Sequence, residues 1–281
     1  MPELPEVETV VRQLAATLPG RRILDVDILH PDLLREPSQS FRRALQGPTI
    51  DTVKRRGKNI LLALSTHEFL VVNLGMTGQL LFAPSSSEGA DTSEKGPVPH
   101  LALSFTLEPG GALLYVDTRR FGCLRRFGVA EWEKESSRLG PEPLDPELTP
   151  KVLRGRLARS RSPIRSWLLN QTRIAGVGNI YASEALFRAG IHPQRAARSL
   201  SSKESSGLLK AVRDVLSEAI HARGTTLRDY RTASGERGGF GPSLRVYGQK
   251  GVPCPGCNAP IERIVFANRS AFFCPQCQPG E

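Results

Sequence analysis

The chain has 281 residues, of which 39% are hydrophobic, so it can bury a sizeable core. It holds 26 glycines and 22 prolines, too few for a disordered chain, and no apolar run approaches the ~20 residues of a membrane helix. The N-terminus, MPELPEVE, lacks the cationic start and apolar stretch of a secretory signal. We therefore expect a cytoplasmic protein.

The formal net charge of +10 is unevenly distributed. Residues 1–150 hold 17 Lys and Arg against 20 Asp and Glu, a net charge of −3. Residues 151–281 hold 21 against 8, a net charge of +13. Such asymmetry predicts a polyanionic partner, although a basic protein without one is the alternative. The basic half shows no basic amphipathic helix, which favours nucleic acid over a membrane surface.

The first predicted element is a helix over residues 3–18, where apolar residues recur at helical spacing after an acidic first turn. From residue 21 to about 130, short β-type runs separated by glycine and polar turns predict a sandwich or barrel. These runs cover residues 22–28, 59–64, 69–74, 79–82, 101–107, 113–117 and 123–129. The Ser/Gly/Pro-rich residues 84–99 predict a flexible loop.

Proline-rich residues 140–150 predict a linker at the charge boundary, and a helical region follows it. Helices are expected over residues 162–170, 180–189 and 201–222, with a break at Gly176–Gly178. Four glycines within residues 229–243 predict a mobile loop there.

Four of the five cysteines form two CxxC pairs separated by 16 residues: Cys254, Cys257, Cys274 and Cys277. This spacing predicts one structural Zn²⁺ held by four thiolates on a hairpin, with free or redox thiols as the alternative. Cys123 is a lone thiol in a predicted strand and is assigned to core packing. Arg269 lies near the hairpin tip, where it suits a phosphate contact or is simply a solvated turn arginine.

The N-terminus itself suggests chemistry. Removal of the initiator Met leaves Pro2 with a terminal secondary amine, and an α-amino group has a pKa near ~8 against ~10.4 for lysine. A neutral amine can attack carbon and form a Schiff base, with Glu3 and Glu6 placed for proton transfer. The alternative is a proline at a helix start followed by acids that suit the helix dipole.

Motifs along the whole chain occur in one familiar order: MPELPEVET, RRGKNILL, LGMTGQL, DTRRFG, LGPEPL, GVGNIYASEALF, GIHP, TTLRDY, VYGQKG and CxxC…NRSAFFCxxC. The chain thus closely resembles the bacterial formamidopyrimidine-DNA glycosylase (Fpg/MutM) family over nearly its full length. PELPE, rather than PEGPE, favours this branch over the endonuclease VIII type.

The resemblance implies a multidomain α+β fold. Residues 1–139 are expected to form a catalytic domain with an N-terminal helix and a β-sandwich. After the linker at 140–150, residues 151–245 are expected to form a helix–two-turn–helix domain with a lesion loop at 229–243. Residues 246–281 complete the chain as a zinc ribbon.

The resemblance also implies an enzyme, a DNA-formamidopyrimidine glycosylase and DNA-(apurinic or apyrimidinic site) lyase of base-excision repair. Its expected partner is double-stranded DNA with an oxidised purine, such as 8-oxoguanine or formamidopyrimidine, or an abasic site. Cleavage is expected by β,δ-elimination. We expect a monomer that works at the nucleoid.

In the implied mechanism, Pro2 is the nucleophile on the sugar C1′ and Glu3 protonates the ring oxygen. Glu6 supports Pro2, and Lys58 binds the phosphate near the lesion. Asn179 and Arg269 bind further phosphates. Asn179 also has an independent basis, because it begins a helix after a glycine-rich break, an anion-binding end.

Met76, Arg119 and Phe121 are implied to enter the duplex where the damaged nucleotide leaves, offsetting part of the cost of eversion. Without the resemblance, Met76 is an apolar turn residue and Phe121 a core residue. The chain departs from the family pattern at Asn73, Val98 and Gln249, which can alter affinity or lesion preference.

Two other functions fit parts of the sequence. One is a non-catalytic DNA-binding protein that uses only the ribbon and the basic half, but the retained Pro2 and Glu3 argue against it. The other is a zinc-ribbon protein acting on RNA. Aromatic residues make up only 6% of the chain, which gives no platform for base stacking.

Overall fold

The computed structural model describes residues 2–85 and 98–280. The predicted loop at 84–99 therefore falls mostly outside the described residues. The chain divides into two compact units. The first contains the residues up to Ser136 together with Ala222–Gly239, and the second contains Ser137–His221 with the residues from Phe240 onward. No described helix is both long enough and apolar enough to cross a membrane.

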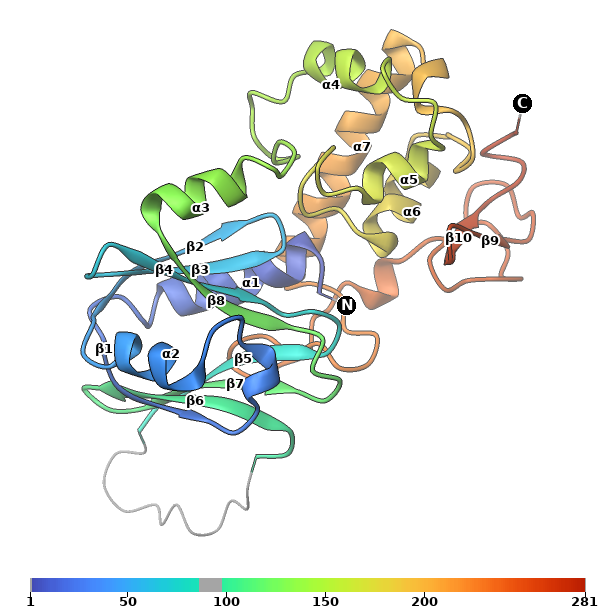
Figure 1. Ribbon diagram of the computed structural model, residues 1–281. Helices are drawn as coiled ribbons and strands as arrows, with labels where there is room; N and C mark the ends of the chain where they lie inside the picture. Colours follow the sequence, from blue (N-terminus) through green and yellow to red (C-terminus); the bar gives the residue numbers. More distant parts are fainter. Residues whose placement is uncertain (1, 86–97, 281) are drawn as a thin grey trace. The chain divides into compact units, whose positions relative to one another are not determined.

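The first unit contains two four-stranded antiparallel sheets (Figure 1), with strand orders β1-β6-β7-β5 and β2-β3-β4-β8. The strands are β1 (Arg22–Ile28), β2 (Ile50–Arg56), β3 (Asn59–Leu64), β4 (Glu68–Asn73), β5 (Gly78–Ala83), β6 (Leu101–Glu108), β7 (Ala112–Asp117) and β8 (Cys123–Gly128). The helices are α1 (Leu4–Ala15), α2 (Ser38–Leu45) and α3 (Val129–Ser136), with a 3₁₀ turn at Pro31–Leu33.

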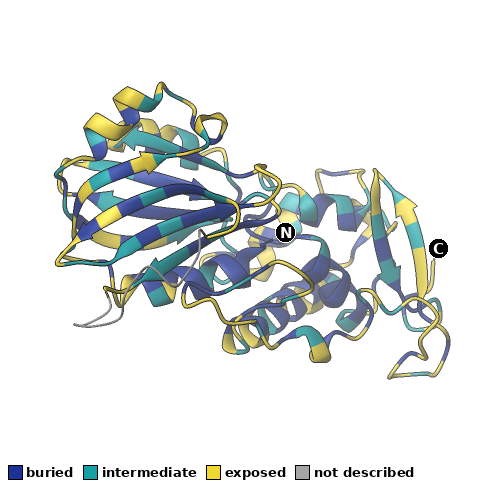
Figure 2. Ribbon diagram, turned by 90° about the horizontal axis from the view of Figure 1, so that it is seen from below, coloured by how far each residue is buried: buried dark blue, intermediate teal, exposed yellow. Residues whose placement is uncertain are grey.

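Helix α1 and both sheets share one hydrophobic core. The apolar stripe of α1 is buried, with Leu4, Val7, Val10 and Leu14 wholly inaccessible, and the helix packs against β2 and β3. Buried and exposed residues alternate over the second half of β6, as expected for a strand with one face on a core. Strands in Figure 2 change between buried and more exposed colours along their length in the same way. This packing fixes α1, and with it the N-terminus, against the β2–β3 hairpin.

Residues 222–239 follow the longest helix in sequence but pack in the first unit. The Ala233 N–H donates to Gln13 Oε1 of α1 at 2.7 Å, and the Ala233 carbonyl accepts from Phe82 N–H of β5 at 3.0 Å. Gln79 Nε2 donates to the Asp229 carbonyl at 2.7 Å. Part of the predicted lesion loop is therefore hydrogen-bonded to the helix that carries Glu3 and Glu6.

The second unit is mainly helical. Its elements are α4 (Pro150–Leu157), α5 (Ile164–Leu169), α6 (Asn179–Arg188), α7 (Ser202–His221), 3₁₀ turns at Ala197–Ser199 and Gly241–Ser243, and the hairpin strands β9 (Glu262–Phe266) and β10 (Arg269–Phe273). Glu184 of α6 is wholly buried, and its carboxylate accepts the backbone N–H groups of Arg245, Val246 and Tyr247 at 2.8–3.2 Å. These bonds anchor the chain that enters the ribbon.

Candidate active site and zinc centre

Two buried glutamates form the first turn of α1. Pro2 is buried, and Glu3 and Glu6 are 2% and 1% exposed. Glu3 is the N-cap residue, and its side chain accepts from the backbone N–H of Glu6. In return, Glu6 Oε2 accepts the Glu3 N–H at 2.8 Å. This reciprocal capping box fixes both carboxylates beside Pro2.

The second oxygen of Glu6 binds a segment 219 residues away in the chain. Glu6 Oε1 accepts the Thr225 N–H at 2.7 Å. The Tyr230 hydroxyl donates to the carbonyls of Glu6 and Arg223 at 3.3 and 3.2 Å. Burial, and secondarily the Glu6 charge, raise the pKa of Tyr230, so its hydroxyl remains a donor.

The close contact between Glu6 and the backbone near Thr225 requires glycine at position 224. The φ of Gly224 is +84°, and a Cβ there lies 3.0 Å from Glu6 Oε1. Both the left-handed backbone and the short distance exclude a larger side chain without strain. We call the contacts of Glu6 with Glu3, Thr225 and Tyr230 the N-terminal clasp.

Lys58 is half-buried on the β2–β3 turn, directly after Gly57, whose φ is +59°. Arg55 of β2 fixes this turn. Its Nε donates to Glu8 Oε2 of α1 at 2.8 Å, and its NH1 donates to the Gly57 carbonyl at 2.9 Å. Burial raises the pKa of Glu8, but hydrogen bonds from Arg12 and Arg55 outweigh it and lower the pKa overall. Glu8 thus stays an anion that ties the Lys58 turn to α1.

Met76, Arg119 and Phe121 lie on two neighbouring loops, one between β4 and β5 and one between β7 and β8. Met76 is 39% exposed and Phe121 is 59% exposed, so Phe121 is not a core residue. The Arg119 guanidinium lies 4.6 Å from the centre of the Phe121 ring. Exposed apolar side chains next to a cation suit insertion between bases.

Asn179 and the ribbon hairpin are joined inside the second unit. Asn179 is the first residue of α6, and its Nδ2 donates to the Ser270 carbonyl at 3.1 Å. Arg165, which is 1% exposed, donates to Asn179 Oδ1 and to the Ser270 carbonyl, both at 2.6 Å. Its guanidinium also lies 4.8 Å from the centre of the Phe266 ring.

Arg165 stays charged in this position. Burial, and secondarily the charge of Arg269, lower its pKa to about 10, which leaves it protonated at neutral pH. Arg269 is exposed at the start of β10, one residue before Ser270, whose carbonyl accepts from Asn179 and Arg165. The sequence did not single out Arg165; an arginine inside the otherwise apolar IRSWLL helix was the available signal.

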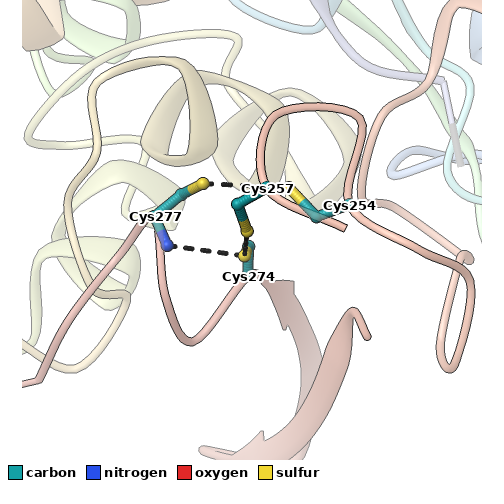
Figure 3. A group of neighbouring side chains, drawn as sticks. All are labelled: Cys254, Cys257, Cys274 and Cys277. Atoms are coloured by element: carbon teal, nitrogen blue, oxygen red, sulfur yellow. Dashed lines mark hydrogen bonds between the residues drawn. The ribbon is translucent and has the colours of Figure 1, made fainter. Parts of the chain in front are cut away.

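The four ribbon cysteines converge (Figure 3), with their sulfur atoms within 4.8 Å of one another. Cys257 Sγ lies 3.4 Å from Cys274 Sγ, and Cys254 Sγ lies 3.8 Å from Cys277 Sγ. Tetrahedral Zn²⁺ with Zn–S bonds of about 2.3 Å requires sulfur separations of about 3.8 Å. The four side chains therefore fit one structural Zn²⁺, and no ligand position remains for water.

Backbone groups also favour thiolate at this site. The Gly256 N–H donates to Cys254 Sγ at 3.4 Å, as the Cys277 N–H does to Cys274 Sγ. Burial raises the pKa of Cys254, but hydrogen bonds, first those from the N–H groups of Gly256 and Cys257, outweigh it and lower the pKa to about 7. Without metal, burial raises the pKa of Cys274, and the hydrogen bond with Cys257 raises that of Cys277, so these two thiols keep their protons. Metal binding requires the thiolate form.

We expect Cys254→Ser to lose zinc and to unfold the ribbon, because the ribbon's own core is small and metal binding supplies its folding free energy. Atomic absorption measures the zinc content, and hydrogen exchange measures how far the backbone of the ribbon is protected. Cys123→Ser, at the one cysteine outside the cluster, is the matched control and should keep its zinc. Full zinc occupancy in Cys254→Ser contradicts the four-ligand site.

The predicted residues are thus divided between the two units. The first unit carries Pro2, Glu3, Glu6, Lys58, Met76, Arg119 and Phe121, and the second carries Asn179, Arg269 and the four ribbon cysteines. One unit presents a buried pair of acids and two loops with exposed apolar side chains, and the other presents cations and a Cys₄ ribbon. Together they define a zinc-ribbon protein built for nucleic-acid chemistry.

Comparison with known proteins gives the family. Three family models match: the formamidopyrimidine-DNA glycosylase N-terminal domain over residues 1–124, its H2TH domain over residues 139–231, and the zinc finger found in FPG and IleRS over residues 251–280. The formamidopyrimidine-DNA glycosylase of Thermomicrobium roseum is 44% identical, with 99% of each chain covered. The chain belongs to the formamidopyrimidine-DNA glycosylase family.

Solved structures agree with this assignment. The MutM (Fpg) protein of Thermus thermophilus is 40% identical, with a TM-score of 0.86 over 99% of this chain and 98% of that one. Lactococcus lactis Fpg in complex with DNA containing an abasic site is 31% identical, with a TM-score of 0.89 over 99% of this chain and 100% of that one. The α+β fold with a terminal zinc ribbon is therefore confirmed.

Proposed function

We propose that this protein is a base-excision repair glycosylase and abasic-site lyase that acts on duplex DNA containing oxidised purines such as 8-oxoguanine and formamidopyrimidines. The N-terminal clasp is the observation that carries the proposal. It holds two buried carboxylates next to the residue whose amine becomes the chain terminus once Met1 is removed.

The chemistry follows from these groups. The neutral Pro2 amine attacks C1′ of the damaged nucleoside, the bond from C1′ to the base nitrogen breaks, and the base leaves with a proton. Glu3 donates a proton to the ring oxygen, the C1′–O4′ bond opens, and a Schiff base to Pro2 results. Loss of the 3′ phosphate and then the 5′ phosphate by β,δ-elimination cleaves the strand, and hydrolysis releases Pro2.

Glu6 serves this reaction indirectly, because its two oxygens bind the Glu3 and Thr225 N–H groups and so set the position of the first helical turn. Lys58 binds the phosphate beside the lesion, and Asn179 and Arg269 bind others. Met76, Arg119 and Phe121 fill the space that the everted nucleotide leaves.

We further propose the domain boundaries 1–139, 140–150, 151–245 and 246–281, with residues 229–243 covering the everted base. The contacts of Gln13, Gln79 and Phe82 with residues 229–233 support a loop placed next to the catalytic helix. The protein works as a monomer on chromosomal DNA at the nucleoid.

A direct test uses end-labelled duplexes that carry 8-oxoguanine opposite cytosine, a formamidopyrimidine, an abasic site or undamaged guanine. The proposal predicts cleavage of the first three, with phosphate at both ends of the resulting gap, and none of the fourth. Binding to all four duplexes without cleavage would identify a non-catalytic DNA-binding protein instead.

We expect Arg269→Ala to weaken binding to every duplex and to reduce the slope of log K against log salt concentration by about 1, the signature of one lost phosphate contact. Arg263→Ala is the matched control, because Arg263 lies on the partner strand β9 and donates to Ser270 Oγ at 2.9 Å. Fluorescence anisotropy at several salt concentrations measures both. An unchanged slope in Arg269→Ala removes Arg269 from the phosphate contacts.

A further inference from the structure

Asp117, the last residue of β7, is 2% exposed and binds both loops that carry the proposed wedge residues. Asp117 Oδ1 accepts the Thr77 hydroxyl at 2.5 Å, next to Met76, and the Arg119 N–H at 3.2 Å. Asp117 Oδ2 accepts the Gly122 N–H at 2.9 Å and the Tyr115 hydroxyl at 3.4 Å. One carboxylate thus holds the β4–β5 loop and both ends of the Arg119–Phe121 segment.

The two loops are in direct backbone contact at this point. Gly75 has φ +56°, and a Cβ there lies 2.5 Å from the Gly122 nitrogen and from the Phe121 carbonyl carbon. A Cβ on Gly122 lies 1.8 Å from the Tyr115 hydroxyl. No side chain fits between the loops, so their separation is fixed by the hydrogen bonds around Asp117.

The same network reaches the Lys58 turn through Asn73. Asn73 Nδ2 donates to Oδ1 of Asn59, the residue after Lys58, at 2.9 Å, and Asn73 Oδ1 accepts the Gly75 N–H at 3.0 Å. The Tyr115 hydroxyl also donates to the Asn73 carbonyl, at 3.3 Å. Burial, and then the Asp117 charge, raise the pKa of Tyr115, so it remains a donor.

We propose that Asp117 is a positioning residue for base eversion. It keeps the Met76 loop and the Arg119–Phe121 loop at a fixed distance from each other and fixes their position relative to the Lys58 turn. The inference rests on the proposed function, since it assigns these loops the task of opening the duplex. Asp117 itself touches neither the reacting sugar nor Pro2 in this role.

The chemistry of the four bonds makes the role specific to aspartate. The backbone N–H groups of Arg119 and Gly122 bind different oxygens of Asp117, and neither N–H can become an acceptor. Asparagine offers one oxygen, so its amide nitrogen must face one of these N–H donors. Asp117→Asn therefore removes one of the two N–H bonds while preserving side-chain size. Either the Gly122 N–H loses its acceptor, or the Arg119 N–H keeps only its second bond, to Thr77 Oγ1 at 3.1 Å.

The test compares Asp117→Asn with Asp25→Asn, which changes a half-buried aspartate that pairs with Arg42 on the same unit. Stopped-flow fluorescence of 2-aminopurine next to 8-oxoguanine in a duplex reports eversion, and kcat/KM reports excision. Borohydride trapping on a single-stranded abasic oligonucleotide reports the Pro2 chemistry without any duplex to open. We expect Asp117→Asn to lose about 100-fold in eversion rate and in kcat/KM, the effect of a misplacement near 1 Å. Trapping should match wild type, and Asp25→Asn should match it in all three assays.

An eversion rate in Asp117→Asn equal to that of wild type overturns the inference. An equal loss in all three assays also overturns it, because such a loss marks a folding defect.

Thr77→Val and Thr77→Ser form a second pair of variants with a smaller expected effect. We expect the valine variant to slow eversion about 10-fold, because it lacks the hydroxyl that a hydrogen bond to a charged group requires, and the serine variant to restore it. Equal rates in the two also overturn the inference. Failure of wild type to trap any abasic DNA would instead refute the proposed function.

Discussion

A single glycine left in front of Pro2 is expected to abolish excision of 8-oxoguanine and strand cleavage, while duplex binding persists. The extension converts the Pro2 amine into an amide nitrogen, which is not nucleophilic. It also forces added backbone into the buried position beside Glu3 and Glu6. Single-turnover cleavage and gel-shift assays on the same duplex measure the two properties separately.

The control for this variant is the same glycine added after Glu281, which leaves the N-terminus unchanged. That protein should cleave at the wild-type rate. Undiminished cleavage by the N-terminally extended protein, with the extension verified by mass spectrometry, would show that the nucleophile is another group.

The second large effect is expected at Glu3. Glu3→Gln keeps an N-cap acceptor for the Glu6 N–H but cannot deliver a proton to the sugar ring oxygen. Removal of a general acid costs about 10²- to 10⁴-fold in rate. We therefore expect base excision to fall by that factor with little change in thermal stability or in DNA affinity.

Glu8→Gln is the matched control on the same helix, because Glu8 pairs with Arg12 and Arg55 rather than with the N-terminus. It should retain most of the excision rate, although it weakens the tie to the Lys58 turn. Excision by Glu3→Gln within a few-fold of wild type would remove Glu3 from the proton transfer.

Much of the fold could be predicted because its pattern is local. Short β-type runs between turns predicted the bounds of β1 and β3 correctly, and helical spacing predicted α1, α6 and α7 within about three residues at each end. The hairpin between the CxxC pairs is likewise confirmed as β9 and β10.

The elements that were missed lack such a pattern. Strand β2, IDTVKRR, is mostly charged or polar, and its only wholly buried side chain is Ile50. It is a strand because β3 pairs with it. Helix α2 buries only Phe41 and Leu45, and α3 only Trp132. In each case contacts with distant parts of the chain determine whether the segment is a helix or a strand, and a local sequence pattern cannot predict those contacts.

The candidate site likewise contains residues that the sequence predicts and contacts that only the fold reveals. The chemistry of an N-terminal proline amine pointed to Pro2 and Glu3, and the CxxC spacing pointed to the zinc cysteines, whereas Lys58 came from the family resemblance alone. The bond from Thr225 to Glu6 joins residues 219 positions apart, and no spacing rule predicts it. Asp117 lay within the quoted DTRRFG motif, but its role depends on which loops meet in the fold.

The proposed mechanism requires a covalent bond between the Pro2 nitrogen and C1′ of the damaged nucleotide. Borohydride reduces a Schiff base to a stable amine, so incubation with an 8-oxoguanine duplex and borohydride, followed by proteolysis and mass spectrometry, locates the attachment. We expect one adduct, on the N-terminal peptide that begins at Pro2. An adduct on a lysine, or excision without any adduct, would contradict the proposed mechanism.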